Sequence, residues 1–205
     1  MPVTNEKVKL CNAALMMLGA RPISAFDDGS DAGIICKRLY DGIKLTSLGM
    51  YPWSFSFRRI NLSRLAAPAS HEYEFQYPLP TDRINNIRAV YSSNRSDEQA
   101  LSSGWVVEGG LLLTDETFIN VSYQFQVGEA AMPTYFTFFF THMIAWNIAE
   151  AVTDQLSKAQ YFKELAVGGP ADDFRGGLFR NAAYMDSQNR NIGSIEGFPL
   201  VQVRA

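Results

Sequence analysis

The chain has 205 residues, which is enough for one domain with a sizeable core, or for a core with a smaller insertion. Its hydrophobic fraction of 47% and charged fraction of 19% are typical of a folded protein and exclude wholesale disorder. A formal net charge of −3 argues against a nucleic-acid binder that grips phosphates with a broad basic surface, although DNA can pass such a protein without being held. The opening residues, MPVTNEKVKL, contain no apolar signal segment, so we expect a soluble intracellular protein.

The first fifty residues predict two helices. In a helix over 5–18, apolar side chains recur at helical spacing. This stripe consists of Val8, Cys11, Leu15 and Leu18. A second helix begins after Ser30 or Asp31 and stops at Tyr51, because Pro52 disfavours helical geometry at the residue before it. Its predicted apolar stripe consists of Ile35, Leu39, Ile43, Thr46 and Met50.

After the proline the hydrophobic period changes from that of a helix to that of a strand. Phe55 and Phe57 begin this register, and the run INVSYQFQV shows the clearest alternation. Between them, WVVEGGLLLT places Gly109 and Gly110 in a two-residue hairpin turn, because such a turn needs the positive φ angles that glycine adopts freely. Residues 55–127 therefore predict a small antiparallel sheet of about five strands, with one apolar and one wet face.

Helical periodicity returns in the last third of the chain. A helix over 133–156 is apolar enough to resemble a membrane span, but polar residues such as Glu150 interrupt it and are expensive in lipid. We therefore expect a buried core helix. A fourth helix begins near Lys158, is broken by GGPADDFRGG and resumes over 178–188. The tail NRNIGSIEGFPLVQVRA has no helical stripe and is expected to be extended.

These elements predict an α+β fold: a four-helix bundle with an inserted small antiparallel β-sheet domain and an extended C-terminal tail. No helix pair buries its apolar face alone, so residues 1–52 and 131–190 must pack together as one discontinuous bundle. Residues 53–130 then form the inserted β domain, and 191–205 form the tail.

The stretch GMYPWSFSFRRINL lies where the bundle leads into the sheet. We expect Trp53, Phe55 and Phe57 to pack at this domain joint. The same aromatic residues, with Arg58 and Arg59, could instead stack on nucleic-acid bases. The absence of a wider basic groove favours the packed joint.

The sequence offers no catalytic constellation, so we expect no enzyme. His71 and His142 have no acidic or thiol group at metal-ligand spacing, so no metal site is expected. Cys11 and Cys36 lie among apolar residues and predict buried, reduced thiols. Phosphate-binding and nucleophile motifs are absent, so no cofactor is expected. The only conceivable acid–base group lies on the third helix and consists of His142, Glu150 and Asp154.

Several segments occur in an order that is typical of one family. They are LCNAALMMLGARPISAF, YPWSFSFRRINL, YPLPTDRINNIRAVY, WVVEGGLLLT, INVSYQFQV, the helix start MPTYF and AAYMDSQ. In this order the chain resembles the tail tubular protein A type of head-to-tail connector (adaptor) of tailed bacteriophages. The resemblance covers residues 5–188 and departs from the family pattern at GGPADDFRGG, which interrupts the fourth helix.

The resemblance implies a structural virion protein at the head–tail interface, assembled in the host bacterial cytoplasm. Such adaptors form a ring of about twelve copies that binds the portal protein and the next tail component, a nozzle or tail tube protein. DNA passes through the axial channel without sequence-specific binding, and no membrane is involved. A small intracellular binding or regulatory module that uses an exposed sheet edge is the alternative.

The C-terminal tail is expected to be the docking element. It is apolar without a helical stripe, so it has no evident place in the core of one molecule. We expect it to add to the portal or to a neighbouring subunit by edge pairing, with a frayed terminus as the alternative. The predicted docking residues are Ile192, Ile195, Phe198, Leu200, Val201 and Val203.

Overall fold

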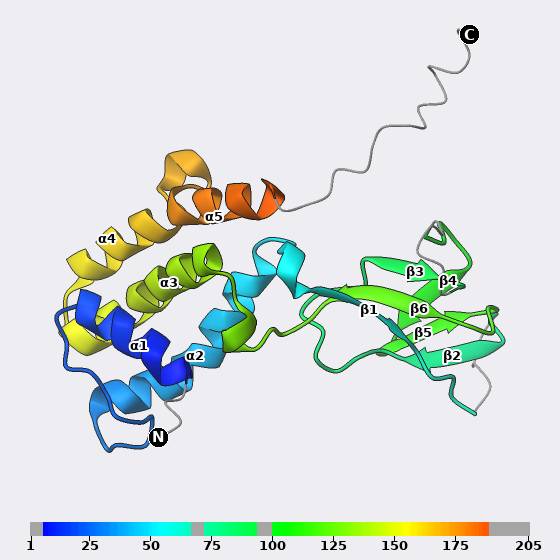
Figure 1. Ribbon diagram of the computed structural model, residues 1–205, viewed down its shortest axis with the longest axis horizontal. Coiled ribbons are helices and arrows are strands. Elements are labelled where there is room, and N and C mark those ends of the chain that lie inside the picture. The colour runs from blue at the N-terminus through cyan, green and yellow to red at the C-terminus, as the bar shows by residue number, and fades with distance from the viewer. Residues whose placement is uncertain (1–5, 67–71, 94–99, 189–205) are drawn as a thin grey trace, which may run out of the picture.

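The computed structural model describes residues 6–66, 72–93 and 100–188. Within them the fold is of mixed α and β class, with helices gathered at one end and strands at the other (Figure 1). Five α-helices are present in the described residues: α1 (Glu6–Met17), α2 (Asp31–Gly49), α3 (Thr134–Thr153), α4 (Leu156–Val167) and α5 (Gly177–Gln188). All strands lie between α2 and α3 in the chain.

The two N-terminal helices are close to the predicted ones. The apolar stripe predicted for α1 is buried, and Cys11 and Cys36 are free, buried thiols that lie against each other. Ser30 caps α2, and its hydroxyl accepts a hydrogen bond from the backbone N–H of Gly33 at 3.0 Å. This satisfies one of the backbone donors that a helix start leaves without an intrahelical partner.

The apolar stripe predicted for α2 is wrong in part. Leu39 is 38% exposed, whereas the buried face runs through Cys36, Tyr40 and Ile43. Tyr40 is buried because its ring meets that of Phe140 and its hydroxyl has a polar partner, described below. With both contacts, Tyr40 faces the core in place of its neighbour Leu39.

The predicted break at GGPADDFRGG is confirmed, but the segments on its two sides are two separate helices. The α3 helix ends where Asp154 adopts a left-handed conformation with φ of 53°, which allows α4 to begin directly afterwards at Leu156. The segment GGPADDFRGG contains the short helix η3 (Pro170–Asp172) and separates α4 from α5. The α4 and α5 helices therefore pack as two distinct elements beside α3.

The helical core is built around α3. This helix packs against α1, α2, α4 and α5, which explains why its sequence is apolar almost all the way round. Its buried aromatic residues are Phe136, Phe139 and Phe140. No helix in the described residues is both long and apolar enough to cross a membrane.

In the described residues the strand region contains six strands in two antiparallel sheets, not one sheet of about five strands. The first sheet has the order β1-β6-β3 and the second has the order β2-β5-β4. The strands are β1 (Phe57–Asn61), β2 (Phe75–Pro78), β3 (Ala89–Tyr91), β4 (Trp105–Glu108), β5 (Leu111–Thr114) and β6 (Asn120–Gln124). The predicted hairpin turn is confirmed, since Gly109 and Gly110 join β4 to β5 with φ angles of 56° and 84°.

The two sheets enclose a hydrophobic cluster of their own. It includes Tyr77, Val90, Leu112, Val121 and Tyr123, and it is separate from the cluster among the helices. The division into two sheets was not predicted, because alternation along a strand indicates its apolar face but not the strands with which it pairs. The described residues therefore form two apolar clusters, one among the helices and one between the sheets.

Candidate functional site at the junction of helices and sheets

The junction is centred on Trp53, which is fully buried in the helical cluster. Its ring centroid lies 5.0 Å from that of Phe136 and 6.1 Å from that of Phe179, so it contacts both α3 and α5. The indole N–H donates a hydrogen bond of 3.1 Å to the backbone carbonyl of Ser47 in α2. This carbonyl belongs to the last turn of the helix, where backbone oxygens have no partner within the helix.

The other two aromatic residues of the predicted joint lie differently. Phe55, in the short helix η1 (Ser54–Ser56), is partly buried and packs on Phe136 with 5.1 Å between ring centroids. Phe57 begins β1 and lies outside both apolar clusters, with the guanidinium of Arg88 over its ring at 4.9 Å. Trp53 therefore lies in the helical core, Phe55 at its edge and Phe57 outside it at the start of the sheet.

A single buried amide side chain, that of Gln124, connects the last strand to the end of α2. Its Nε2 lies 2.7 Å from the carbonyl oxygen of Leu48 and 3.0 Å from that of Tyr51. The same nitrogen lies 3.0 Å from the hydroxyl of Ser56, and its Oε1 accepts a hydrogen bond from Asn85. Gln124 is only 3% exposed, so these contacts replace water for polar groups of three different segments.

A buried carboxylate, that of Asp186, ties α5 to the same junction. It accepts hydrogen bonds from the backbone N–H of Ser54 at 2.9 Å and from the Ser54 hydroxyl at 2.8 Å. The hydroxyl of Tyr135, next to the start of α3, donates to it at 2.7 Å. Helices α3 and α5 and the segment before β1 therefore share one acceptor with no exposed surface.

An ion pair braces the return path from the sheets. The ammonium group of Lys44 lies 2.8 Å from the carboxylate of Glu129 in η2 (Glu129–Ala131), and both side chains are largely covered. Burial opposes ionisation of Glu129, but the hydrogen bond and charge of Lys44 outweigh it and lower the pKa of this carboxyl. Burial and the nearby Glu129 charge raise the pKa of Tyr40, whose hydroxyl donates to the same carboxylate.

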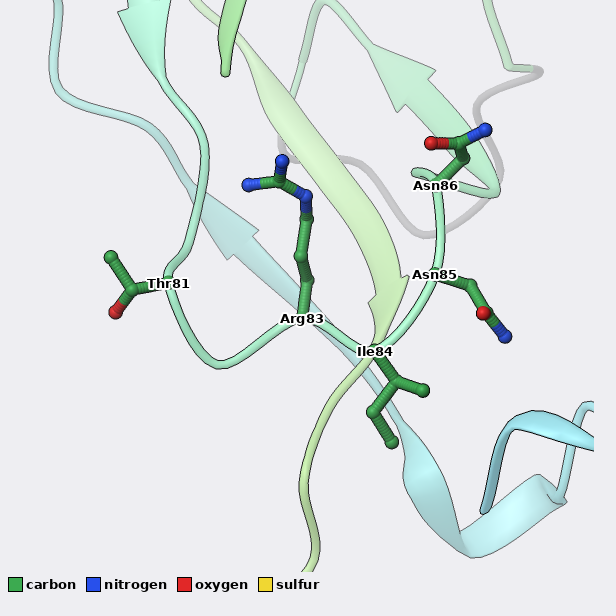
Figure 2. Close-up of a pocket in the computed structure, with 5 residues that line it drawn as sticks. All are labelled: Thr81, Arg83, Ile84, Asn85 and Asn86. Carbon is green, nitrogen blue, oxygen red and sulfur yellow. The ribbon is translucent and has the colours of Figure 1, made fainter. Parts of the chain in front are cut away.

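The surface of the junction is hollowed beside the loop between β2 and β3. A hollow of about 700 Å³ is lined by Thr81, Arg83, Ile84, Asn85 and Asn86. Figure 2 shows these five side chains on the loop. An adjoining hollow of about 530 Å³ reaches the C-terminal turn of α2. The guanidinium of Arg83 donates to the carbonyl of Pro80, and no carboxylate of the described residues pairs with it. Such an open polar hollow can receive an acidic or amide side chain of a partner.

The structure does not assemble the conceivable acid–base group. His142 is buried, and its Nδ1 lies 2.8 Å from the carbonyl oxygen of Phe138, while Glu150 and Asp154 are exposed. Eight residues of helix separate His142 from Glu150, a rise of about 12 Å. In the part of the chain that the structure describes, no group of three or more potential metal ligands occurs.

The sequence did not indicate Gln124 or Asp186 as junction residues. Gln124 stands on the polar side of an alternating strand, where a buried amide looks like a solvent-facing one. Asp186 did carry a signal, because it follows Phe179 and Ala182 at helical spacing on the buried face of α5. The predicted docking residues of the tail, 192–203, lie outside the described residues.

Comparison with known proteins does not place the chain in a family. No protein-family model matches the chain, and no curated protein matches it either.

Proposed function

We propose that the chain is a ring-forming head-to-tail connector of a tailed bacteriophage. In this proposal it is a structural virion protein without catalytic activity or cofactor. It links the portal protein to the nozzle or tail tube and leaves a channel through which DNA passes. Its place is the head–tail interface of the virion, after assembly in the bacterial cytoplasm.

The observation that carries the proposal is the convergence of the family-like segments on one place. YPWSFSFRRINL contributes Trp53 and Ser54, YPLPTDRINNIRAVY contributes Asn85, INVSYQFQV contributes Gln124, and AAYMDSQ contributes Asp186. These side chains meet at the junction, although Ser54 and Asp186 stand 132 positions apart in the chain. Segments that occur in the family order and also meet at one junction support the resemblance more strongly than unrelated short motifs would.

The proposal includes the finer architecture. Residues 1–52 and 131–190 would form the discontinuous helical bundle, 53–130 the inserted β domain and 191–205 the extended tail. The guanidinium of Arg83 pairs with no carboxylate of the described residues, and a neighbouring subunit with a carboxylate would complement it in its open hollow.

The test is assembly with the portal. By itself the purified chain should form no ring, and rings of about twelve copies should form when portal-containing heads are added. Cryo-electron microscopy of the particles and native mass measurement would give the copy number. Absence of any ring on heads that bind the chain would overturn the proposal.

A small binding module remains the second candidate function. The observation that favours it is an open sheet edge at β4, whose neighbouring side chains Val106 and Val107 are exposed. Binding of a peptide partner without ring formation in the presence of heads would support this alternative.

A further inference from the structure

The two sheets have four edge strands, and three of these edges are protected. The backbone N–H of Leu101 donates to the carbonyl of Val90 and covers the outer side of β3. Leu65 does the same at Gln76 of β2, a strand that also ends in proline. The edge strand β1 carries two adjacent arginine side chains, a device that discourages pairing with another chain.

The fourth edge, β4, has none of these devices along its first three residues. Glu108 and Leu111 flank the two-residue turn and form a hydrogen-bonded pair, so the next pair along, Val107 and Leu112, does not exchange hydrogen bonds. The N–H and C=O groups of Val107, and by alternation those of Trp105, therefore point away from β5. No described residue bonds to these groups.

The side chains beside this open edge are apolar. Val106 is 45% exposed and Val107 is 38% exposed. Trp105 and Val107 lie on the face of the sheet that carries Leu112, a buried member of the cluster between the sheets. A strand added to β4 would therefore extend that apolar face if its own inward residues were apolar and β-branched.

One stretch of the chain outside the described residues has this pattern. The segments MPVTN, APASH and NRSDEQ contain no run of apolar β-formers, whereas residues 200–203 read LVQV. Val201 and Val203 would share one face of a strand, with Gln202 on the other, and four residues match the length of β4. Residues 189–199 between α5 and this stretch span at most about 36–40 Å.

We propose that the open edge of β4 accepts residues 200–203 of a second copy of this chain as an additional strand. The N–H and C=O groups of Trp105 and Val107 form the backbone hydrogen bonds, and Val201 and Val203 cover the apolar side. Helix α5, from which the segment leaves, ends at the junction beside the start of β1, whereas β4 is the outer strand of the other sheet (Figure 1). This separation favours an adjacent molecule as the acceptor. The inference concerns the chain alone and does not depend on the connector proposal.

Amide hydrogen exchange of the full-length protein tests the proposal directly. The Trp105 and Val107 amides, followed by NMR from micromolar to millimolar concentration, should become protected as the concentration rises. Where nine-tenths of the molecules are paired, exchange at both amides should slow about tenfold, because only the unpaired tenth exchanges. The amides of β5, already bonded within the sheet, serve as the internal reference for folding.

Three variants test the two sides of this pairing: one in the added segment, a control beside it, and one on β4. Val201→Pro removes a donor and the strand geometry from the added segment, and should abolish the protection. Ser194→Pro introduces a proline outside residues 200–203, so the Trp105 and Val107 amides should stay protected in this control. On the acceptor side, Val107→Lys adds a charge at an exposed edge position and should abolish protection of the Trp105 amide while β5 stays protected.

Three outcomes would overturn the inference. Protection that does not depend on concentration would mean that the segment pairs within its own molecule. Protection that persists in Val201→Pro would assign the edge to another occupant, such as β4 of a second copy. Unprotected Trp105 and Val107 amides at every concentration would show that this edge accepts no strand.

Discussion

Replacement of Trp53 by alanine should destabilise the protein more than any surface change. The side chain is fully buried, and an aromatic residue of this size removes about 150–250 Å² from water. At about 25 cal/mol per Å², its transfer alone is worth about 4–6 kcal/mol. Measured losses for such large-to-small changes in cores are about 3–5 kcal/mol, and we expect Trp53→Ala to fall in that range.

A second substitution separates packing from hydrogen bonding. Trp53→Phe keeps most of the contact with Phe136 and Phe179 but removes the N–H that bonds the carbonyl of Ser47. The carbonyl would be left buried without that partner, at a cost of about 1–3 kcal/mol. The phenylalanine variant should therefore lie between the wild type and the alanine variant.

Urea denaturation followed by far-ultraviolet circular dichroism gives the free energy of unfolding for each variant. Tyr184→Ala is a suitable control, since Tyr184 is 65% exposed and should change stability by less than about 0.5 kcal/mol. If Trp53→Ala and Tyr184→Ala unfold at the same urea concentration, the assignment of Trp53 to the core of the junction is wrong.

Two further predictions concern the polar contacts. Gln124→Leu keeps the side-chain volume but removes the amide that serves the end of α2, and should cost about 1–3 kcal/mol for each group left buried and unpaired. Gln126→Leu, at an exposed position, should have little effect in the same urea denaturation assay. For Glu129 the folded pKa is depressed, so its stabilisation is present above its ordinary value of 4.5 and is lost as the pH falls below it. Glu129→Gln should therefore flatten the acid limb of a stability–pH profile, which Glu150→Gln, at an exposed position, should leave unchanged.

Much of the secondary structure could be predicted from local patterns. The stripe of α1, the stop at Pro52 and the turn at Gly109 and Gly110 each depend on the chemistry of neighbouring residues, which the sequence displays directly. The buried face of α2 could not be predicted in the same way. Tyr40 is buried because Phe140 packs on its ring and Glu129, also far along the chain, accepts its hydroxyl.

The junction was partly predictable. The change of period at Pro52 located it, and Trp53 does lie in the helical core. Its polar contacts were invisible because they join residues that are distant in the chain, such as Gln124 and Leu48. A glutamine that will be buried and one that will be exposed look identical in the sequence, and only the tertiary contacts distinguish them.

The position of Asp186 has a mechanical consequence. Asp186 lies two residues before Gln188, the last residue of α5, and its carboxylate holds the backbone of Ser54 directly before β1. Tension applied to the chain beyond α5 would therefore act on both the start of the first strand and α3, whose Tyr135 donates to the same carboxylate. A pull on the C-terminus would therefore place load on the contact between the helices and the first sheet.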